Sequence, residues 1–239
     1  MMSLQDTLMD SISGRKDTLE VSEAISLASK LHEGEFRKNN EPYIIHPLHV
    51  AIILAQMNAD NDTLAAAVLH DTVEDTDISV RELKSLFNQK VAFLVDGVSK
   101  YRKAEFDTKE GCDLANHEKL LLYTAEDVRV MFLKLADRIH NMRTIEYLSE
   151  PKQKENAKET IEFFLPFSRN FDLEYSDELL NNSLRCLGCN NDKFEATPLP
   201  IEWQTRLLKA RRSLIMKQIA ARRNSIISSQ LVRRRERNN

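Results

Sequence analysis

Apolar residues recur every three or four positions along most of the chain, and this spacing is typical of amphipathic helices. It predicts helices near residues 21–36, 61–71, 79–87, 88–100, 113–124, 126–148, 152–164 and 176–187, and one more that begins at Pro47. The 5 Gly and 6 Pro are few for a β-sandwich or a dinucleotide-binding fold, and neither GxxxxGK nor GxGxxG occurs. We therefore predict an all-α fold.

Local signals place several helix starts. Ser79 and Glu82 have the spacing of a capping box, and Asn61 or Asp62 is expected to cap the third helix. Pro47 suits the first residue of its helix, because its missing N–H costs nothing there. This puts His46 at a helix N-terminus. The charged stretch 101–111 is a candidate substrate lid.

Four side chains that bind metals or carry protons lie within six residues, after a buried-type Ala/Leu/Val run: His70, Asp71, Glu74 and Asp75. Burying a carboxylate or an imidazole is costly without compensation, and a metal ion is the usual compensation. Residues four apart share a helix face, so the four side chains can face one cleft. The alternative is a helix end with a solvated acidic turn.

Two more residues have contexts that fit a metal site. His46 precedes an apolar helix, and Asp137 lies on an apolar stripe where an unpartnered carboxylate is unusual. Asn141 and Thr144 follow on the same face, at plus four and plus seven. Two His and two Asp make a mixed nitrogen and oxygen site, which suits Mn, Fe or Zn better than Ca.

The formal charge is −3, but it is unevenly distributed. Residues 201–239 carry 11 Lys and Arg against 2 acidic residues, a net charge of +9, which leaves −12 on residues 1–200. We expect an N-terminal arm (1–19), a catalytic domain (20–189), a linker (190–200) and a basic helical extension (201–239). The extension could contact nucleic acid, a membrane surface or an acidic protein face, or pack on the body or in a homo-oligomer.

The chain start has no apolar core of the kind found in signal peptides, and no apolar stretch is long enough to span a bilayer. Three cysteines without a secretory context favour a reducing, cytoplasmic location. Cys186 and Cys189 form a CxxC that lacks a second pair, so we expect structural thiols.

Four segments together resemble the HD-domain hydrolase module of the RelA/SpoT family, over about residues 20–170. They are EPYIIHP (41–47), LHDTVEDTD (69–77), VDGVSK (95–100) and DVRVMFLKLADRIHNMRT (127–144). The resemblance implies an HD-domain helical bundle. It also implies metal-dependent hydrolysis of the 3′-pyrophosphate of the alarmones ppGpp and pppGpp, which yields GDP or GTP and pyrophosphate.

The resemblance also assigns roles to individual positions. The residues that match the family's metal ligands, with Mn²⁺ as the expected ion, are His46, His70, Asp71 and Asp137. Glu74 and Asp75 match the acidic pair that orders the attacking water. The residues expected to bind the substrate are Arg37, which would stack on the base, together with Lys38, Asn141 and Thr144.

Two departures from the family separate this chain from its larger members. Only 69 residues follow Asn170, too few for a nucleotidyl-transfer domain, so a stand-alone small alarmone hydrolase is expected. Residues 165–172 read LPFSRNFD where the family has a segment like APLAHRLG. Two alternatives stay open: a hydrolase of another phosphorylated nucleoside such as NADPH at its 2′-phosphate, and a regulatory protein that binds alarmone or a partner synthetase.

Overall fold

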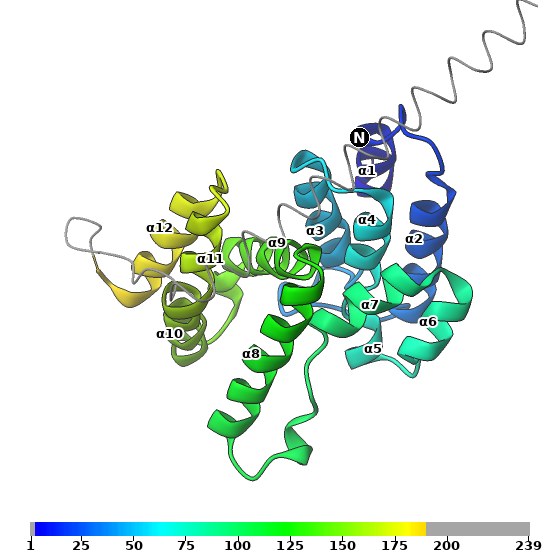
Figure 1. Cartoon of the computed structure of the whole chain (residues 1–239). Helices are drawn as coiled ribbons and strands as arrows, with labels where there is room; N and C mark the ends of the chain where they lie inside the picture. The colour runs from blue at the N-terminus through cyan, green and yellow to red at the C-terminus, as the bar shows by residue number, and fades with distance from the viewer. Residues whose placement is uncertain (1–2, 190–239) are drawn as a thin grey trace, which may run out of the picture.

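A computed structural model describes residues 3–189 as a bundle of helices (Figure 1). The first half contains α1 (Leu4–Ser11), α2 (Leu19–Leu31), α3 (Ile45–Gln56), α4 (Asn61–Leu69), α5 (Thr72–Asp75), α6 (Val80–Leu86) and α7 (Gln89–Val98). The second half contains α8 (Lys109–Glu126), α9 (Arg129–Arg143), α10 (Glu150–Glu159), α11 (Leu165–Asn170) and α12 (Ser176–Leu187). Short 3-10 turns cover Lys103–Glu105 and Ile145–Tyr147, and a π-helical turn covers Thr160–Phe164. No strand occurs between residues 3 and 189, so the all-α prediction is confirmed.

Helix α9 is the centre of the bundle. Figure 1 shows it between a group built from α1 to α7 and a group built from α10 to α12. It packs on α3, α4 and α7 on one side and on α12 and the π-helical turn on the other. Most of its apolar residues are buried, and Val130, Leu133 and Ala136 are fully so. Four polar residues of α9 are buried between these neighbours, so all four need partners inside the protein.

Several helix boundaries differ slightly from the predicted ones. The cap of α4 is Asp60, whose carboxylate accepts a hydrogen bond from the Thr63 N–H, so the expectation of Asn61 or Asp62 was wrong. Helix α3 begins two residues before Pro47, which still lies in the first turn. The capping box of Ser79 and Glu82 is present at the start of α6.

The N-terminal segment is part of the packed body. Residues 4–11 form α1, and Leu8 and Ile12 are buried in the common core. The predicted linker at 190–200 and the basic extension at 201–239 lie outside the described residues. Within residues 3–189, no helix is both long enough and apolar enough to cross a membrane.

Candidate metal centre and the adjoining cleft

Three buried side chains from three helices meet at one point. His46 lies in the first turn of α3, His70 directly follows α4, and Asp137 lies in the middle of α9. One potential ligand atom from each lies within 4.8 Å of the others. The His46 Nε2 atom is 3.2 Å from Asp137 Oδ1, and the His70 Nε2 atom is 3.8 Å from the same oxygen.

Asp71, the fourth predicted ligand, borders this cluster of three. Its carboxylate oxygens lie 3.1 Å from His70 Nε2 and 3.6 Å from His46 Nε2. The helix breaks between α4 and α5, and both His70 and Asp71 keep right-handed helical backbone angles there.

The donor set fits a divalent metal ion. The His70 Nδ1 atom is 2.8 Å from the Ala67 carbonyl oxygen, so Nδ1 carries a proton, and Nε2 is the ring nitrogen left to bind a metal. That Nε2 atom is buried and, among the described residues, has no hydrogen-bond partner, because the nearby Asp71 oxygen is not in hydrogen-bonding geometry. A buried lone pair that faces two carboxylates is a ligand position that a cation would satisfy.

Lys134 is a further member of the site that the sequence did not single out. Its ammonium donates to Asp137 Oδ2 at 2.8 Å, and both residues are buried. Burial alone would raise the pKa of Asp137, but the positive charge of Lys134 opposes this effect, and the pKa is held well below its ordinary value. Asp137 is therefore ionised whether or not a metal is bound.

The predicted catalytic acids point in different directions. The Tyr43 hydroxyl lies 2.8 Å from Asp71 Oδ2 and 2.8 Å from Asp75 Oδ2, so it joins a predicted ligand to a predicted catalytic acid. Glu74 turns the other way and accepts a hydrogen bond from the Lys100 backbone N–H at 2.7 Å. Crowding by neighbouring protein atoms raises the pKa of Glu74, although Lys134 partly opposes this, and the residue itself is exposed.

The residues predicted to bind substrate fall into two groups. Arg37 and Asn141 are joined by a hydrogen bond of 2.8 Å, and Asn141 Nδ2 donates to Asp137 Oδ1 at 2.5 Å, so both belong to the surroundings of the centre. Lys38 is exposed and makes no hydrogen bond or ion pair within residues 3–189. Thr144 caps the end of α9, where its hydroxyl donates to the His140 carbonyl oxygen at 3.2 Å.

His140 is a second residue that sequence reasoning missed. Its Nδ1 atom lies 2.8 Å from His46 Nδ1 and 3.3 Å from Arg37 Nη1, and its ring stacks on that of His49 at 4.8 Å. Burial, helped by the neighbouring His46 and His49 rings, lowers the pKa of His140 to about 3. Burial also lowers the pKa of His46, so both rings are neutral at pH 7.

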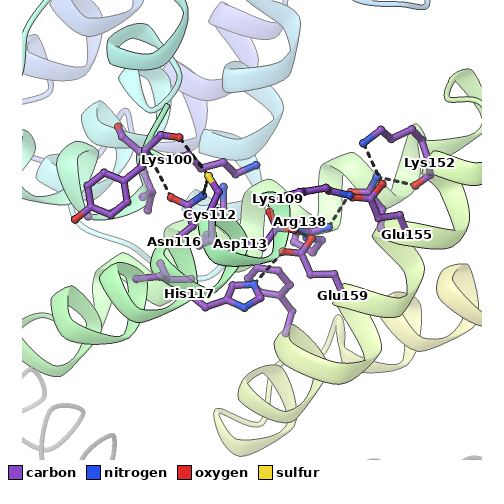
Figure 2. A pocket seen from close by; sticks show the side chains of 18 residues that line it. Lys100, Lys109, Cys112, Asp113, Asn116, His117, Arg138, Lys152, Glu155 and Glu159 are labelled. Atoms are coloured by element: carbon purple, nitrogen blue, oxygen red, sulfur yellow. Dashed lines mark hydrogen bonds and ion pairs between the residues drawn. The ribbon is translucent and has the colours of Figure 1, made fainter. Parts of the chain in front are cut away.

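A polar cleft of about 260 Å³ adjoins the cluster (Figure 2). Lys134 connects the two, since it lines the cleft and also bonds Asp137. Figure 2 shows side chains of α8 on one side of the cleft and side chains of α10 on the other. Its basic residues are Lys100, Lys109, Lys134, Arg138 and Lys152, and its acidic residues are Asp113, Glu155 and Glu159.

Most of the basic groups in the cleft are already paired. Arg138 is buried, donates to Glu159 at 2.5 Å and to Asn156 at 3.1 Å, and lies over the Phe164 ring. Glu155 pairs with both Lys109 and Lys152. Lys100 differs, because its ammonium has no acceptor within the described residues and the nearby positive charge of Lys134 lowers its pKa. Arg143 lies outside the cleft and pairs with Glu178.

Comparison with known proteins gives relatives over the same region. The chain is 44% identical over 149 residues to the Haemophilus influenzae protein named guanosine-3′,5′-bis(diphosphate) 3′-pyrophosphohydrolase, and this match covers 62% of the chain and 22% of the relative. It is 42% identical over 153 residues to the Escherichia coli bifunctional (p)ppGpp synthase/hydrolase SpoT, covering 64% of the chain and 22% of that protein. The chain thus spans about a fifth of the length of these relatives.

Two further findings concern the fold and the family. A solved structure of a metazoan ortholog of SpoT superposes with a TM-score of 0.49 at 22% identity, covering 81% of this chain and 94% of the other; that score is too low to carry an argument about the fold. The family described as HD domain matches residues 24–172, a span that contains His46, His70, Asp71 and Asp137. The resemblance noted in the sequence is thereby confirmed, and the chain belongs to the HD-domain family.

Proposed function

We propose that this chain is a metal-dependent hydrolase that removes the 3′-pyrophosphate of ppGpp and pppGpp, releasing GDP or GTP and pyrophosphate. The observation that carries the proposal is the convergence of His46, His70 and Asp137 in a segment that is more than 40% identical to proteins named for this reaction. His70 Nε2, buried and unsatisfied within residues 3–189, supports a resident cation at that point.

The reaction exchanges one bond to phosphorus for another. The oxygen of a water molecule bonds to the phosphorus attached to O3′, the bond from that phosphorus to O3′ breaks, and the released O3′ takes up a proton. A divalent ion held by His46, His70, Asp71 and Asp137, which we propose to be Mn²⁺, would supply positive charge that offsets phosphoryl charge and lowers the pKa of water.

The acidic pair handles the proton in this proposal. Glu74, whose pKa is raised by the crowding of neighbouring protein atoms, accepts the proton of the attacking water. Asp75 and Asp71 share the Tyr43 hydroxyl, which fixes the direction of both carboxylates. Glu74 is thus assigned to proton transfer and Asp75 to ordering the water.

The cations around the centre are assigned to the phosphates and the base. Arg37, Lys38, Asn141 and Thr144 are proposed to bind the nucleotide, with Arg37 on the base. The cleft beyond Lys134 has the charge and room for a phosphate group, and the unpaired ammonium of Lys100 lies beside it. The basic extension 201–239 is proposed to contact an acidic surface, and a cytoplasmic location is consistent with such a substrate.

The test is release of pyrophosphate from ppGpp by the purified protein, measured with Mn²⁺ and with chelator, and with NADPH as a second substrate. Turnover of ppGpp that requires Mn²⁺ is expected. Cleavage of NADPH without cleavage of ppGpp would assign the same centre to another phosphorylated nucleoside. Metal binding without turnover of either compound would favour a regulatory binding protein and contradict the proposal.

Variants separate metal binding from proton transfer. Asp71→Ala is expected to lose Mn²⁺ affinity and activity together. Glu74→Gln is expected to keep Mn²⁺ affinity and to lose turnover by a factor of about 10² to 10⁴, the usual contribution of a general base. Calorimetric Mn²⁺ titration beside the activity assay distinguishes the two effects, and full activity in Glu74→Gln would show that the acidic pair is wrongly assigned.

A further inference from the structure

A chain of hydrogen bonds leads from Arg37 to two predicted metal ligands by separate routes. One route passes through the His140 ring to His46, and the other passes through the Asn141 amide to Asp137. Arg37 lies in the loop between α2 and α3, whereas the two intermediate residues lie on α9. The loop therefore reaches the buried side of the centre.

The donor and acceptor roles along the first route can be deduced in order. A guanidinium can only donate, so the His140 Nδ1 atom, 3.3 Å from Arg37 Nη1, must be an acceptor. The contact of 2.8 Å between His140 Nδ1 and His46 Nδ1 then requires the proton to be on His46, so the single lone pair of His140 Nδ1 accepts a short bond from His46 and a longer one from Arg37. A neutral His46 that is protonated at Nδ1 has its lone pair at Nε2, the atom that faces Asp71 and Asp137. This is the tautomer that binds a metal through Nε2.

The second route has the same logic. Arg37 Nη2 donates to Asn141 Oδ1, which fixes the orientation of the amide. The amide nitrogen then faces Asp137 Oδ1 and donates to it at 2.5 Å. The opposite amide orientation would place two oxygens against each other, so Arg37 holds this carboxylate in place through Asn141.

We propose that Arg37 is a positioning residue of the metal centre, acting through His140 and Asn141, in addition to the nucleotide contact assigned to it above. The inference rests on the proposed metal centre but does not depend on which nucleotide is hydrolysed. Partners in the outer shell of a metal site typically contribute a factor of about 10 to 100 to metal affinity.

The test measures Mn²⁺ affinity by calorimetry in the whole 239-residue chain without any nucleotide. Arg37→Met removes the donors and keeps the length of the side chain, and Lys38→Met removes the neighbouring charge, which has no partner within residues 3–189. Losing a nearby positive charge should by itself tighten the binding of a cation. We therefore expect Arg37→Met to weaken Mn²⁺ binding by about 10-fold, while Lys38→Met leaves it equal or slightly tighter.

Two variants of His140 test the intermediate ring. In His140→Asn the amide oxygen lies close to the position of Nδ1, so Mn²⁺ affinity should be largely retained. His140→Phe keeps a ring against His49 but removes the acceptor, so affinity should fall as in Arg37→Met. The side-chain ¹⁵N shifts of His46 in metal-free protein should show the proton on Nδ1 in the wild type, and a shift toward Nε2–H in Arg37→Met.

The possible results are distinct. A wild-type protein with the proton of His46 on Nε2, or an Arg37→Met variant with unchanged Mn²⁺ affinity, overturns the positioning role and leaves the hydrolase proposal standing. A wild-type protein that binds no divalent metal overturns both. If Lys38→Met weakens Mn²⁺ binding as much as Arg37→Met, any change in this loop weakens the centre. The proposed action of Arg37 through His140 and Asn141 is then rejected.

Discussion

Individual polar residues inside α9 show how the centre is built. Lys134, Asp137, Arg138 and His140 are all buried, and each has a partner within the described residues. Isolated charges in such a place would be strongly destabilising, but here the ammonium of Lys134 and the carboxylate of Asp137 compensate each other. The same pair keeps Asp137 ionised and ready to bind a cation.

The neutral ring of His140 predicts a pH dependence of stability. Its pKa is about 3 in the folded protein against an ordinary value of 6.5, so between these pH values the unfolded chain binds a proton that the folded chain does not. Stability should thus fall as the pH drops from 6.5 toward 3, by up to about 1.4 kcal/mol per pH unit from this group. In His140→Phe this contribution is absent.

Urea unfolding in chelator at several pH values between 7 and 4 checks this prediction. The free energy of unfolding of the wild type should exceed that of His140→Phe by most at pH 7, and this difference should shrink as the pH falls. A difference that stays constant over this range would mean that His140 titrates alike in the folded and unfolded states.

At the scale of whole elements, α7 approaches its neighbours closely at Gly97. A Cβ atom at this position would lie 2.8 Å from Tyr123 Cδ1 on α8 and 3.0 Å from Val130 Cγ1 on α9. The absence of a side chain therefore sets how near the three helices come. Lys100 follows shortly after, so this packing also places the backbone that bonds Glu74.

Gly97→Ala should destabilise the protein despite the higher helix propensity of alanine. Overpacking in a dense core costs about 1–3 kcal/mol, against a gain of up to about 1 kcal/mol from propensity. Gly111→Ala is the matched control, because Gly111 is exposed at the start of α8. A Cβ atom added there would meet only the Thr108 hydroxyl, at 3.1 Å. Denaturant unfolding should show a loss of stability for Gly97→Ala and little change for Gly111→Ala.

The elements themselves were largely predictable from the sequence. The capping box of Ser79 and the bounds of α12 were both confirmed, because caps and periodicity are local signals. The end of α4 was also predicted to within two residues, since the helix was expected to end near residue 71 and ends at Leu69. Asp137 was noticed on its apolar stripe, but the roles of its surroundings stay predictions.

One of the two residues that were missed, His140, has partners far away in sequence. His140 bonds His46 and Arg37, which precede it by 94 and 103 positions. No local pattern reports such contacts. Lys134, three positions before Asp137, had a signal that could have been used, because residues at this spacing are neighbours on a helix.

At the scale of the whole molecule, the charge opposes the proposed substrate. Residues 1–200 carry a net charge of −12, and the +9 of residues 201–239 brings the total to −3. All predicted site residues lie between positions 37 and 144, so the extension is not needed to complete the centre. Its charge can instead act on the approach of an anionic substrate.

Deleting residues 201–239 should therefore leave kcat and Mn²⁺ affinity unchanged. It should lower kcat/KM for ppGpp at low ionic strength, and the difference should disappear at about 0.5 M salt, where the screening length is only a few ångströms. Steady-state assays across a salt series measure both effects. A fall in kcat at every salt concentration would instead assign the extension a part in assembling the site.

Most cations in the cleft are already neutralised by carboxylates, so an anion that binds there must replace these carboxylates. Glu155 and Glu159 are resident counterions for Lys109, Lys152 and Arg138. An incoming anion must displace them, which a monovalent ion such as chloride cannot do favourably because it offers one charge and no fixed geometry. A phosphate group offers several oxygens at once and can therefore replace them. After the reaction, the carboxylates of Glu155 and Glu159 compete with the bound phosphate for the same cations. Selectivity for multivalent anions and prompt release of the product would thus come from the same two glutamates.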